Sequence, residues 1–174
     1  MATRAQRLDL IAFMGALCLF FSTLEYLFPK PLPFFRLGLA NIPILVSLEL
    51  FSPAYVLLLV LLKVLGQGLM NGTLASYVFL FSLAGSAASG LLMLLVYHVG
   101  RSFISLIGVS VFGAIASNAV QIALSVLFIF GQSAWVMAPP FFGLGVASGL
   151  FVGIFAQQFR NRSQWLSRMR QFYA

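Results

Sequence analysis

Few side chains in this sequence are suited to catalysis, and their positions exclude the common enzyme sites. The chain has three acidic residues, one histidine and one cysteine. Asp9, Glu25 and Glu49 lie far apart along the chain, so the sequence pairs no two of them as acid and base. His98 and Cys18 lack the neighbours that a zinc site or a nucleophilic triad requires. We therefore expect no catalytic residue and no metal ligand.

Motifs for nucleotide and diphosphate chemistry are also missing from the sequence. It contains no Gly-x-x-x-x-Gly-Lys-Ser/Thr loop, so we expect the chain to hydrolyse no ATP by itself. Enzymes that transfer prenyl groups hold Mg²⁺ on a diphosphate with clustered aspartates, and Asp9 is the sole aspartate here. The sequence predicts a protein that is not an enzyme, needs no cofactor, and takes any pumping energy from a partner or a gradient.

Polar residues inside apolar segments are the candidates for binding. Ionisable groups at such positions are costly in lipid and mark functional sites by default. Arg36 is able to form a bidentate pair with a carboxylate or phosphate, whereas Lys63 acts as a point charge. Because these two cations face a single nearby anion, Glu25, we expect an anionic or amphipathic small-molecule ligand. The predicted substrate-binding residues are Glu25, Arg36, Asn41, Lys63, Asn71, Asn118 and Gln121.

A purely structural role explains the same residues, and the sequence leaves both interpretations open. Glu25 would then pair with one of the two cations. The amides of Asn118 and Gln121 would tie helices together through interhelical hydrogen bonds.

The composition shows which solvent surrounds these residues. Of the 174 residues, 61% are hydrophobic and 7% are charged, against about 25% charged in a soluble domain. The chain therefore belongs in a lipid bilayer. The net charge is +7, but the basic residues form no stripe that would bind nucleic acid. Most of them lie near the two ends of the chain, at Arg4, Arg7, Arg160, Arg162, Arg168 and Arg170.

Proline, glycine and polar residues divide the chain into six apolar segments. A bilayer crossing takes about 20 residues, and the lack of strict alternation favours helices over a barrel. We predict an all-α integral membrane protein with six transmembrane helices, in a single domain over residues 1–160, followed by a basic cytoplasmic tail at 161–174. The segments are 8–28, 37–51, 53–70, 74–97, 103–130 and 133–159.

Two of these segments contain residues that disturb a helix. The segment 37–51 is short and includes Asn41, Pro43 and Glu49, so we predict that it is irregular or tilted. Pro139 and Pro140 are predicted to break the last helix in its outer half.

An even number of crossings places both termini on one side, and their basic residues indicate the cytoplasm. We expect a multi-pass protein of the bacterial plasma membrane. With this orientation, Glu25, Arg36 and Lys63 fall in the outer half of the bilayer, whereas Glu49 lies near the inner face. The distribution predicts an outward-facing cavity.

Small residues on the first helix mark a surface that another helix can approach closely. Ala12 and Ala16 are spaced i, i+4, with Gly15 alongside. Such a pattern is common in membrane helices, so internal packing and contact with a partner subunit both remain open.

Several motifs resemble the Gx transporter family, which is also labelled heptaprenyl diphosphate synthase component I. The most specific is Arg36-Leu-Gly-Leu-Ala-Asn41, which is followed by Lys63 and the Asn71-Gly72-Thr73-Leu74 turn. The resemblance continues through Phe81-Ser-Leu-Ala-Gly85 and the 107–121 stretch, and it covers roughly residues 8–155. At Ser117, before Asn118, the family is expected to have a histidine.

The resemblance implies a six-helix bundle similar to the substrate-binding S-components of energy-coupling factor transporters. In such proteins the ligand lies in an outward cavity, and an Ala-x-x-x-Ala face on the first helix contacts the transmembrane coupling subunit. Ala12 and Ala16 match that face by position, and Arg36 and Asn41 match the family element beside the cavity. The implied partners are a small-molecule substrate and an energy-coupling module of a transmembrane subunit plus ATPases.

Two other functions remain open. The family label also describes an accessory membrane subunit, component I, of a heptaprenyl diphosphate synthase. A membrane scaffold that transports nothing is the third interpretation.

Overall fold

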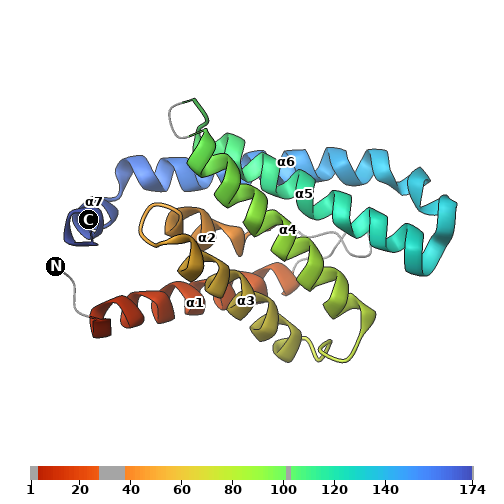
Figure 1. Cartoon of the computed structure of the whole chain (residues 1–174), viewed down its shortest axis with the longest axis horizontal. Helices are drawn as coiled ribbons and strands as arrows, with labels where there is room; N and C mark the ends of the chain where they lie inside the picture. Colours follow the sequence, from red (N-terminus) through yellow and green to blue (C-terminus); the bar gives the residue numbers. More distant parts are fainter. Residues whose placement is uncertain (1–3, 28–37, 101–102, 174) are drawn as a thin grey trace.

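The chain folds as an all-helical bundle (Figure 1). The structure, a computed structural model, describes residues 4–27, 38–100 and 103–173. Within these ranges no strand occurs. The helices are α1 (Arg4–Leu27), α2 (Asn41–Ser47), α3 (Pro53–Met70), α4 (Tyr77–Val99), α5 (Leu106–Ser125), a π-helix η1 (Val126–Phe130), a 3₁₀ helix η2 (Gly131–Met137), α6 (Ala138–Arg162) and α7 (Gln164–Tyr173).

Four helical stretches of the described chain are long and apolar enough to cross a membrane. They are Gln6–Glu25, Pro53–Met70, Tyr77–Val99 and Leu106–Arg162. The last of them, of 57 residues, contains α5, both short helices and α6, and it folds back on itself as an antiparallel hairpin (Figure 1). The prediction of a helical multi-pass membrane protein is therefore confirmed.

Proline and glycine residues of the sequence set several of the helix ends. α3 has the predicted bounds, because Pro53 lacks an N–H and suits the first turn. It ends before Gly72, whose φ of 64° is readily adopted only without a side chain. α4 begins at Tyr77 and ends at Val99, so the predicted segment 74–97 is shifted by about one turn.

α2 is shorter than the predicted segment 37–51. It has seven residues and is about 10 Å long, a third of the thickness of a bilayer core. Residues 42–48 are all buried, and the hydroxyl of Ser47 donates to the carbonyl oxygen of Pro43 at 2.7 Å. α2 is thus enclosed by protein, which keeps this short helix away from lipid.

The predicted break of the last helix at Pro139 and Pro140 is wrong in position. α5 continues into η1, the chain turns at Gly131 with φ 54°, and η2 leads into α6. Both prolines lie in the first turn of α6, where a missing N–H leaves no hydrogen bond unmade. The irregular part of the chain, η1 and η2, therefore lies before the prolines, and the prolines themselves belong to the start of α6.

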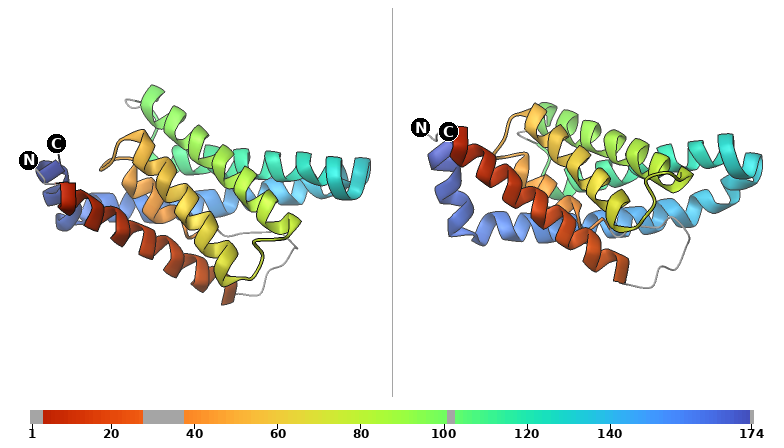
Figure 2. Two further views of the ribbon diagram at one scale, coloured as in Figure 1. Left: turned by 60° about the horizontal axis from the view of Figure 1, so that its bottom comes forward. Right: turned by 90° about the horizontal axis from the view of Figure 1, so that it is seen from below.

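The long helices surround α2 (Figures 1 and 2). α1 packs beside α3, α3 beside α4, α4 beside α5, and α5 beside α6. One buried cluster includes α2 residues such as Ile44 and Leu45, together with at least one side chain from each of α1, α3, α4, α5 and α6. The core of the bundle therefore lies around the shortest helix.

α5 and α6 approach each other so closely that their backbones touch. A Cβ atom added at Gly153 would lie 2.7 Å from the Cα of Ile107, and one added at Gly149 would lie 3.1 Å from the Cα of Val111. Only glycine fits at such distances, which is the usual way that membrane helices gain close packing.

At one end of the bundle α7 packs across the start of α1 (Figure 2). Leu166 is fully buried in a cluster with Leu10 and Met14, and the rings of Phe13 and Trp165 meet edge to face at 6.2 Å. The basic segment predicted as a tail thus contains a helix that is anchored to the bundle.

An ion pair reinforces the same end. Arg160 Nε of α6 lies 2.8 Å from Glu49 Oε1, which follows α2 in the chain. The sequence placed Glu49 near this end but did not identify its partner, because the two residues are more than a hundred positions apart.

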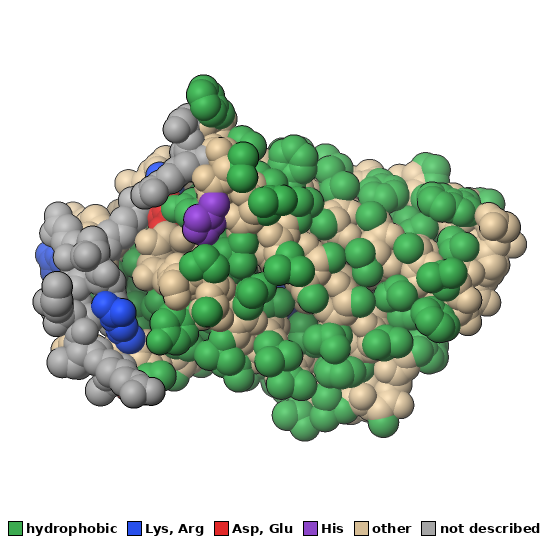
Figure 3. All heavy atoms as spheres, in the orientation of Figure 1, with side chains coloured by type: hydrophobic (Ala, Val, Ile, Leu, Met, Phe, Trp, Pro, Cys, Tyr) green, Lys and Arg blue, Asp and Glu red, His purple; other side chains and the backbone are tan. Residues whose placement is uncertain are grey.

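Hydrophobic side chains cover most of the visible face of the molecule, and most of the charged side chains in view lie near the end with α7 (Figure 3). On α3 the exposed residues include Leu57, Leu58, Leu61, Leu62 and Leu65. Exposing so large an apolar surface to water would be unfavourable, whereas contact with lipid is not.

Replacing Gly153 by leucine is expected to separate α5 from α6. The new side chain would collide with the backbone of Ile107, and such overpacking destabilises by about 1–3 kcal/mol. Thermal unfolding in detergent measures the effect as a lower midpoint. Gly143→Leu is the matched control, since a Cβ at this position on the same helix meets nothing within 4 Å. Equal midpoints for both variants would contradict the proposed close contact.

Candidate functional site

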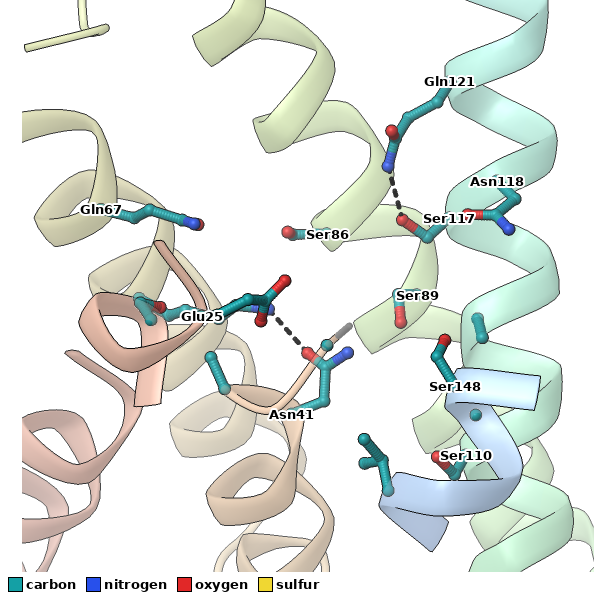
Figure 4. A pocket seen from close by; sticks show the side chains of 17 residues that line it. Glu25, Asn41, Gln67, Ser86, Ser89, Ser110, Ser117, Asn118, Gln121 and Ser148 are labelled. Atoms are coloured by element: carbon teal, nitrogen blue, oxygen red, sulfur yellow. Dashed lines mark hydrogen bonds between the residues drawn. The ribbon is translucent and has the colours of Figure 1, made fainter. Parts of the chain in front are cut away.

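A polar cavity lies inside the bundle between α1, α3, α4, α5, α6 and the start of α2 (Figure 4). The space between its side chains is about 670 Å³, including the part open to the surroundings. The centre of a water-sized sphere can move through about 50 Å³ of it, which is room for a few water molecules. The cavity therefore suits a compact molecule.

One wall of the cavity carries charge. The Lys63 ammonium donates to Asn41 Oδ1 at 2.6 Å, which joins α3 to the first residue of α2. Glu25 Oε2 accepts the backbone N–H of Leu39 at 3.1 Å, which joins the last turn of α1 to the segment that enters α2. Glu25 is 5% exposed and Lys63 is 7% exposed, so both charged groups are almost fully buried.

The opposite wall carries hydroxyl groups. Ser86 and Ser89 of α4 are three positions apart, and Ser110 and Ser117 of α5 are seven apart. Residues at these spacings share one face of a helix, and Ser148 of α6 completes the wall. Figure 4 shows these serines on the far side of the cavity from Glu25.

Among the residues that the structure describes, three buried side-chain oxygens of the cavity have no hydrogen-bond partner. They are Glu25 Oε1, Ser22 Oγ and Ser89 Oγ. Ser22 and Ser89 are each 3% exposed. Buried polar groups in proteins almost always have partners, so these three atoms are the places in the cavity where water or a polar ligand would form hydrogen bonds.

Residues 14–159 match the family described as Heptaprenyl diphosphate synthase component I. This chain belongs to that family. The matched region contains α2–α5, α1 from Met14 onward and α6 up to Phe159, so it includes every described residue that lines the cavity. Neither the comparison with curated proteins nor that with solved structures found a match.

Five of the seven predicted binding residues line the cavity. They are Glu25, Asn41, Lys63, Asn118 and Gln121. The amides also serve the structure, because Asn118 Nδ2 donates to the carbonyl oxygen of Phe141 on α6 at 2.8 Å. Gln121 Nε2 donates to Ser117 Oγ at 2.9 Å within α5. Asn118 therefore ties two helices together, as the structural alternative anticipated.

The other two predicted residues are not part of the cavity as described. Asn71 lies at the end of α3, where its backbone N–H donates to the carbonyl oxygen of Gln67 at 3.1 Å. Arg36 lies outside the described residues. The described cavity contains one carboxylate and one ammonium group, so an excess of positive charge depends on Arg36 and stays a prediction.

Sequence reasoning missed the serines and Gln67. Gln67 follows Lys63 by four positions and Ser22 precedes Glu25 by three, so both share a helix face with a charged residue that was identified. This spacing is the signal that identifies them. Within the described ranges, no three His, Cys, Asp or Glu side chains come together as a metal site.

Ala12 and Ala16 are both exposed on α1. Gly15 faces the protein instead, since a Cβ there would lie 3.9 Å from side-chain atoms of Leu59 and Leu62 on α3. Internal packing among the described residues therefore leaves the two alanines uncovered, and their contact with a partner stays a prediction.

Removing the Asn41 side chain is expected to destabilise the protein. Asn41→Ala withdraws an acceptor from the buried Lys63 ammonium, and a hydrogen bond to a charged group contributes about 1.5–3 kcal/mol. Asn41→Asp keeps an oxygen in place and should retain most of the stability. Thermal unfolding in detergent compares the variants. An Asn41→Ala midpoint equal to that of the wild type would show that the bond contributes nothing.

Proposed function

We propose that this protein is the membrane substrate-binding subunit of an energy-coupling factor type transporter. It captures a small molecule in the polar cavity and passes it through an ATP-driven partner module. The observation that supports this proposal is the polar cavity. A carboxylate and an ammonium group buried within a bundle that has a lipid-compatible exterior mark a functional site by default. The lining of hydroxyl and amide groups offers polar contacts of the kind that fix a ligand's orientation.

The orientation follows from the charges. In this proposal α1–α6 give six crossings of an S-component-like bundle in the bacterial plasma membrane, with α2 as an incomplete one. Both termini lie in the cytoplasm because Arg160, Arg162 and Arg168 gather at the end with α7. Glu25 lies in the last turn of α1, away from that end. The cavity then faces outward.

The ligand of this proposal is a small anionic or amphipathic molecule. Arg36, just before the described Gly38–Asn41 segment in the sequence, would supply a bidentate contact to a carboxylate or phosphate. Lys63 contributes a buried positive charge to the same cavity.

In this proposal the energy comes from another subunit, since the sequence contains no ATP-binding loop of its own. The exposed alanines on α1 offer the contact. Ala12 and Ala16 are separated by four positions and lie on the outside of the bundle, so a second helix can approach α1 closely along this line. We assign this surface to a transmembrane coupling subunit that joins the protein to its ATPases.

Bulky side chains on this surface are expected to abolish assembly. Ala12→Trp and Ala16→Trp should prevent co-purification with the transmembrane coupling subunit and its ATPases, because tryptophan holds the helices apart. The measurement is the amount of coupling subunit recovered with the tagged protein. Ala147→Trp is the matched control, since it adds the same bulk at an exposed alanine on α6. Recovery at the wild-type level from both α1 variants would rule out this contact.

An accessory role in heptaprenyl diphosphate synthesis is the second candidate, and the family match favours it. A soluble partner would then supply the clustered aspartates for Mg²⁺ that this sequence lacks. The deciding assay is prenyl transfer by the soluble subunit in liposomes with and without this chain. Activity that requires the chain would support the accessory role, and equal activity in both would contradict it.

A further inference from the structure

The unpaired oxygens of the cavity indicate the chemistry of its ligand. Glu25 Oε1 is buried without a hydrogen-bond partner, although Oε2 of the same carboxylate accepts from Leu39. A carboxylate oxygen only accepts hydrogen bonds. The group that approaches it in the bound state must therefore be a donor, such as an ammonium, an N–H or a hydroxyl.

An ammonium group compensates a buried carboxylate best. Charge-assisted hydrogen bonds are shorter and roughly twice as strong as neutral ones, and a buried carboxylate is expensive unless an opposite charge accompanies it. Glu25 is 5% exposed, so little of its charge is screened by solvent. The contact at Oε1 therefore favours a positively charged donor.

The same cavity repels a ligand that is only positive. The Lys63 ammonium lines it as well, so a simple cation would bring two positive charges into one small space. A ligand that carries its own acidic group balances this charge. The Oγ atoms of Ser22 and Ser89, which also lack partners, are able to donate to the oxygens of such a group.

The walls and the size of the cavity exclude a long apolar chain. Serine, asparagine and glutamine predominate among the described lining residues, which include no aromatic side chain and Val152 as the largest aliphatic one. An apolar chain would leave these buried polar groups without partners. The narrow open space, about 50 Å³ for the centre of a water-sized sphere, fits a compact head group.

We propose that the cavity binds a compact zwitterion, whose protonated amino group donates to Glu25 Oε1 and whose acidic group faces the serine hydroxyls. Amino acids and phosphoethanolamine represent this class. The inference rests on the proposed function, because it assumes that the cavity receives a small molecule. It narrows the anionic or amphipathic ligand expected from the sequence to one that also carries an amino group.

Matched molecules test the amino group. The purified protein in detergent is offered the standard amino acids and phosphoethanolamine, and its thermal unfolding midpoint is recorded. At least one of them is expected to raise the midpoint. Its N-trimethyl counterpart, such as betaine for glycine or phosphocholine for phosphoethanolamine, should give no rise because it keeps the charge but has no N–H. No rise with any member, or an equal rise with the trimethyl form, would overturn the proposal.

The substitution Glu25→Gln tests whether the Glu25 carboxylate binds the amino group of the ligand. The amide keeps the shape of the side chain, accepts from Leu39 through its oxygen, and places an NH₂ donor where the ligand needs an acceptor. Affinity for the zwitterion should fall about tenfold or more. Without ligand, the unfolding midpoint should stay equal or rise, because the unpaired charge has been removed. An unchanged affinity would contradict the assignment, as would a lower midpoint without ligand.

Glu49→Gln is the matched control for stability. It makes the same change at a carboxylate that has a partner, Arg160 at 2.8 Å, so it should lower the midpoint and leave zwitterion affinity unchanged. Ser89→Ala gives a second test of the cavity: the midpoint without ligand should be unchanged and the affinity lower. An unchanged affinity in Ser89→Ala would remove this serine from the proposed site.

The failure of this inference and that of the proposed function give different results. Small molecules released from the protein as purified are identified by mass spectrometry. A bound molecule without an amino group would overturn the zwitterion and leave the capture function standing. Both would be overturned if the protein releases no small molecule, is stabilised by none of the amino acids or phosphoethanolamine, and recovers no coupling subunit.

Discussion

The bundle depends on keeping α2 away from lipid. A seven-residue helix leaves polar backbone groups at both of its ends, and hydrocarbon offers these groups no partners. The protein encloses α2 instead, with side chains from each of the five long membrane helices in one buried cluster. The cavity is a consequence of this arrangement. Where α2 begins, Gly38, Ala40 and Asn41 leave space that the long helices line but do not fill.

The contacts that fix α2 also form the site. Glu25 holds the backbone of Leu39 and Lys63 holds the side chain of Asn41, so both buried charges contribute to the position of the segment that enters α2. A ligand at Glu25 Oε1 would therefore contact the same carboxylate that anchors this segment. Binding and the position of α2 are coupled through one side chain, which lets a bound molecule affect how firmly α2 is held.

The sequence predicted the parts of the fold that local chemistry determines. Pro53 and the Asn71-Gly72 turn delimit α3 by themselves, and buried charges such as Glu25 and Lys63 are conspicuous in an apolar segment. The length of α2 and the partner of Glu49 depend on contacts between distant parts of the chain, which no local pattern records. The serines escaped notice because serine is common in membrane helices. Only the folded bundle shows that Ser22 and Ser89 face the same space as Glu25.

The glycine contacts between α5 and α6 fix the spacing of one wall of the cavity. At Gly149 and Gly153 the two backbones lie so close that a side chain would not fit between them without a shift, so the serines on α5 and α6 keep their spacing. α1 and α3 also pack closely, because a Cβ at Gly66 of α3 would collide with the side chain of Leu19 on α1. The hydroxyl groups opposite Glu25 and Lys63 therefore form a fixed template against which a molecule in the cavity is oriented.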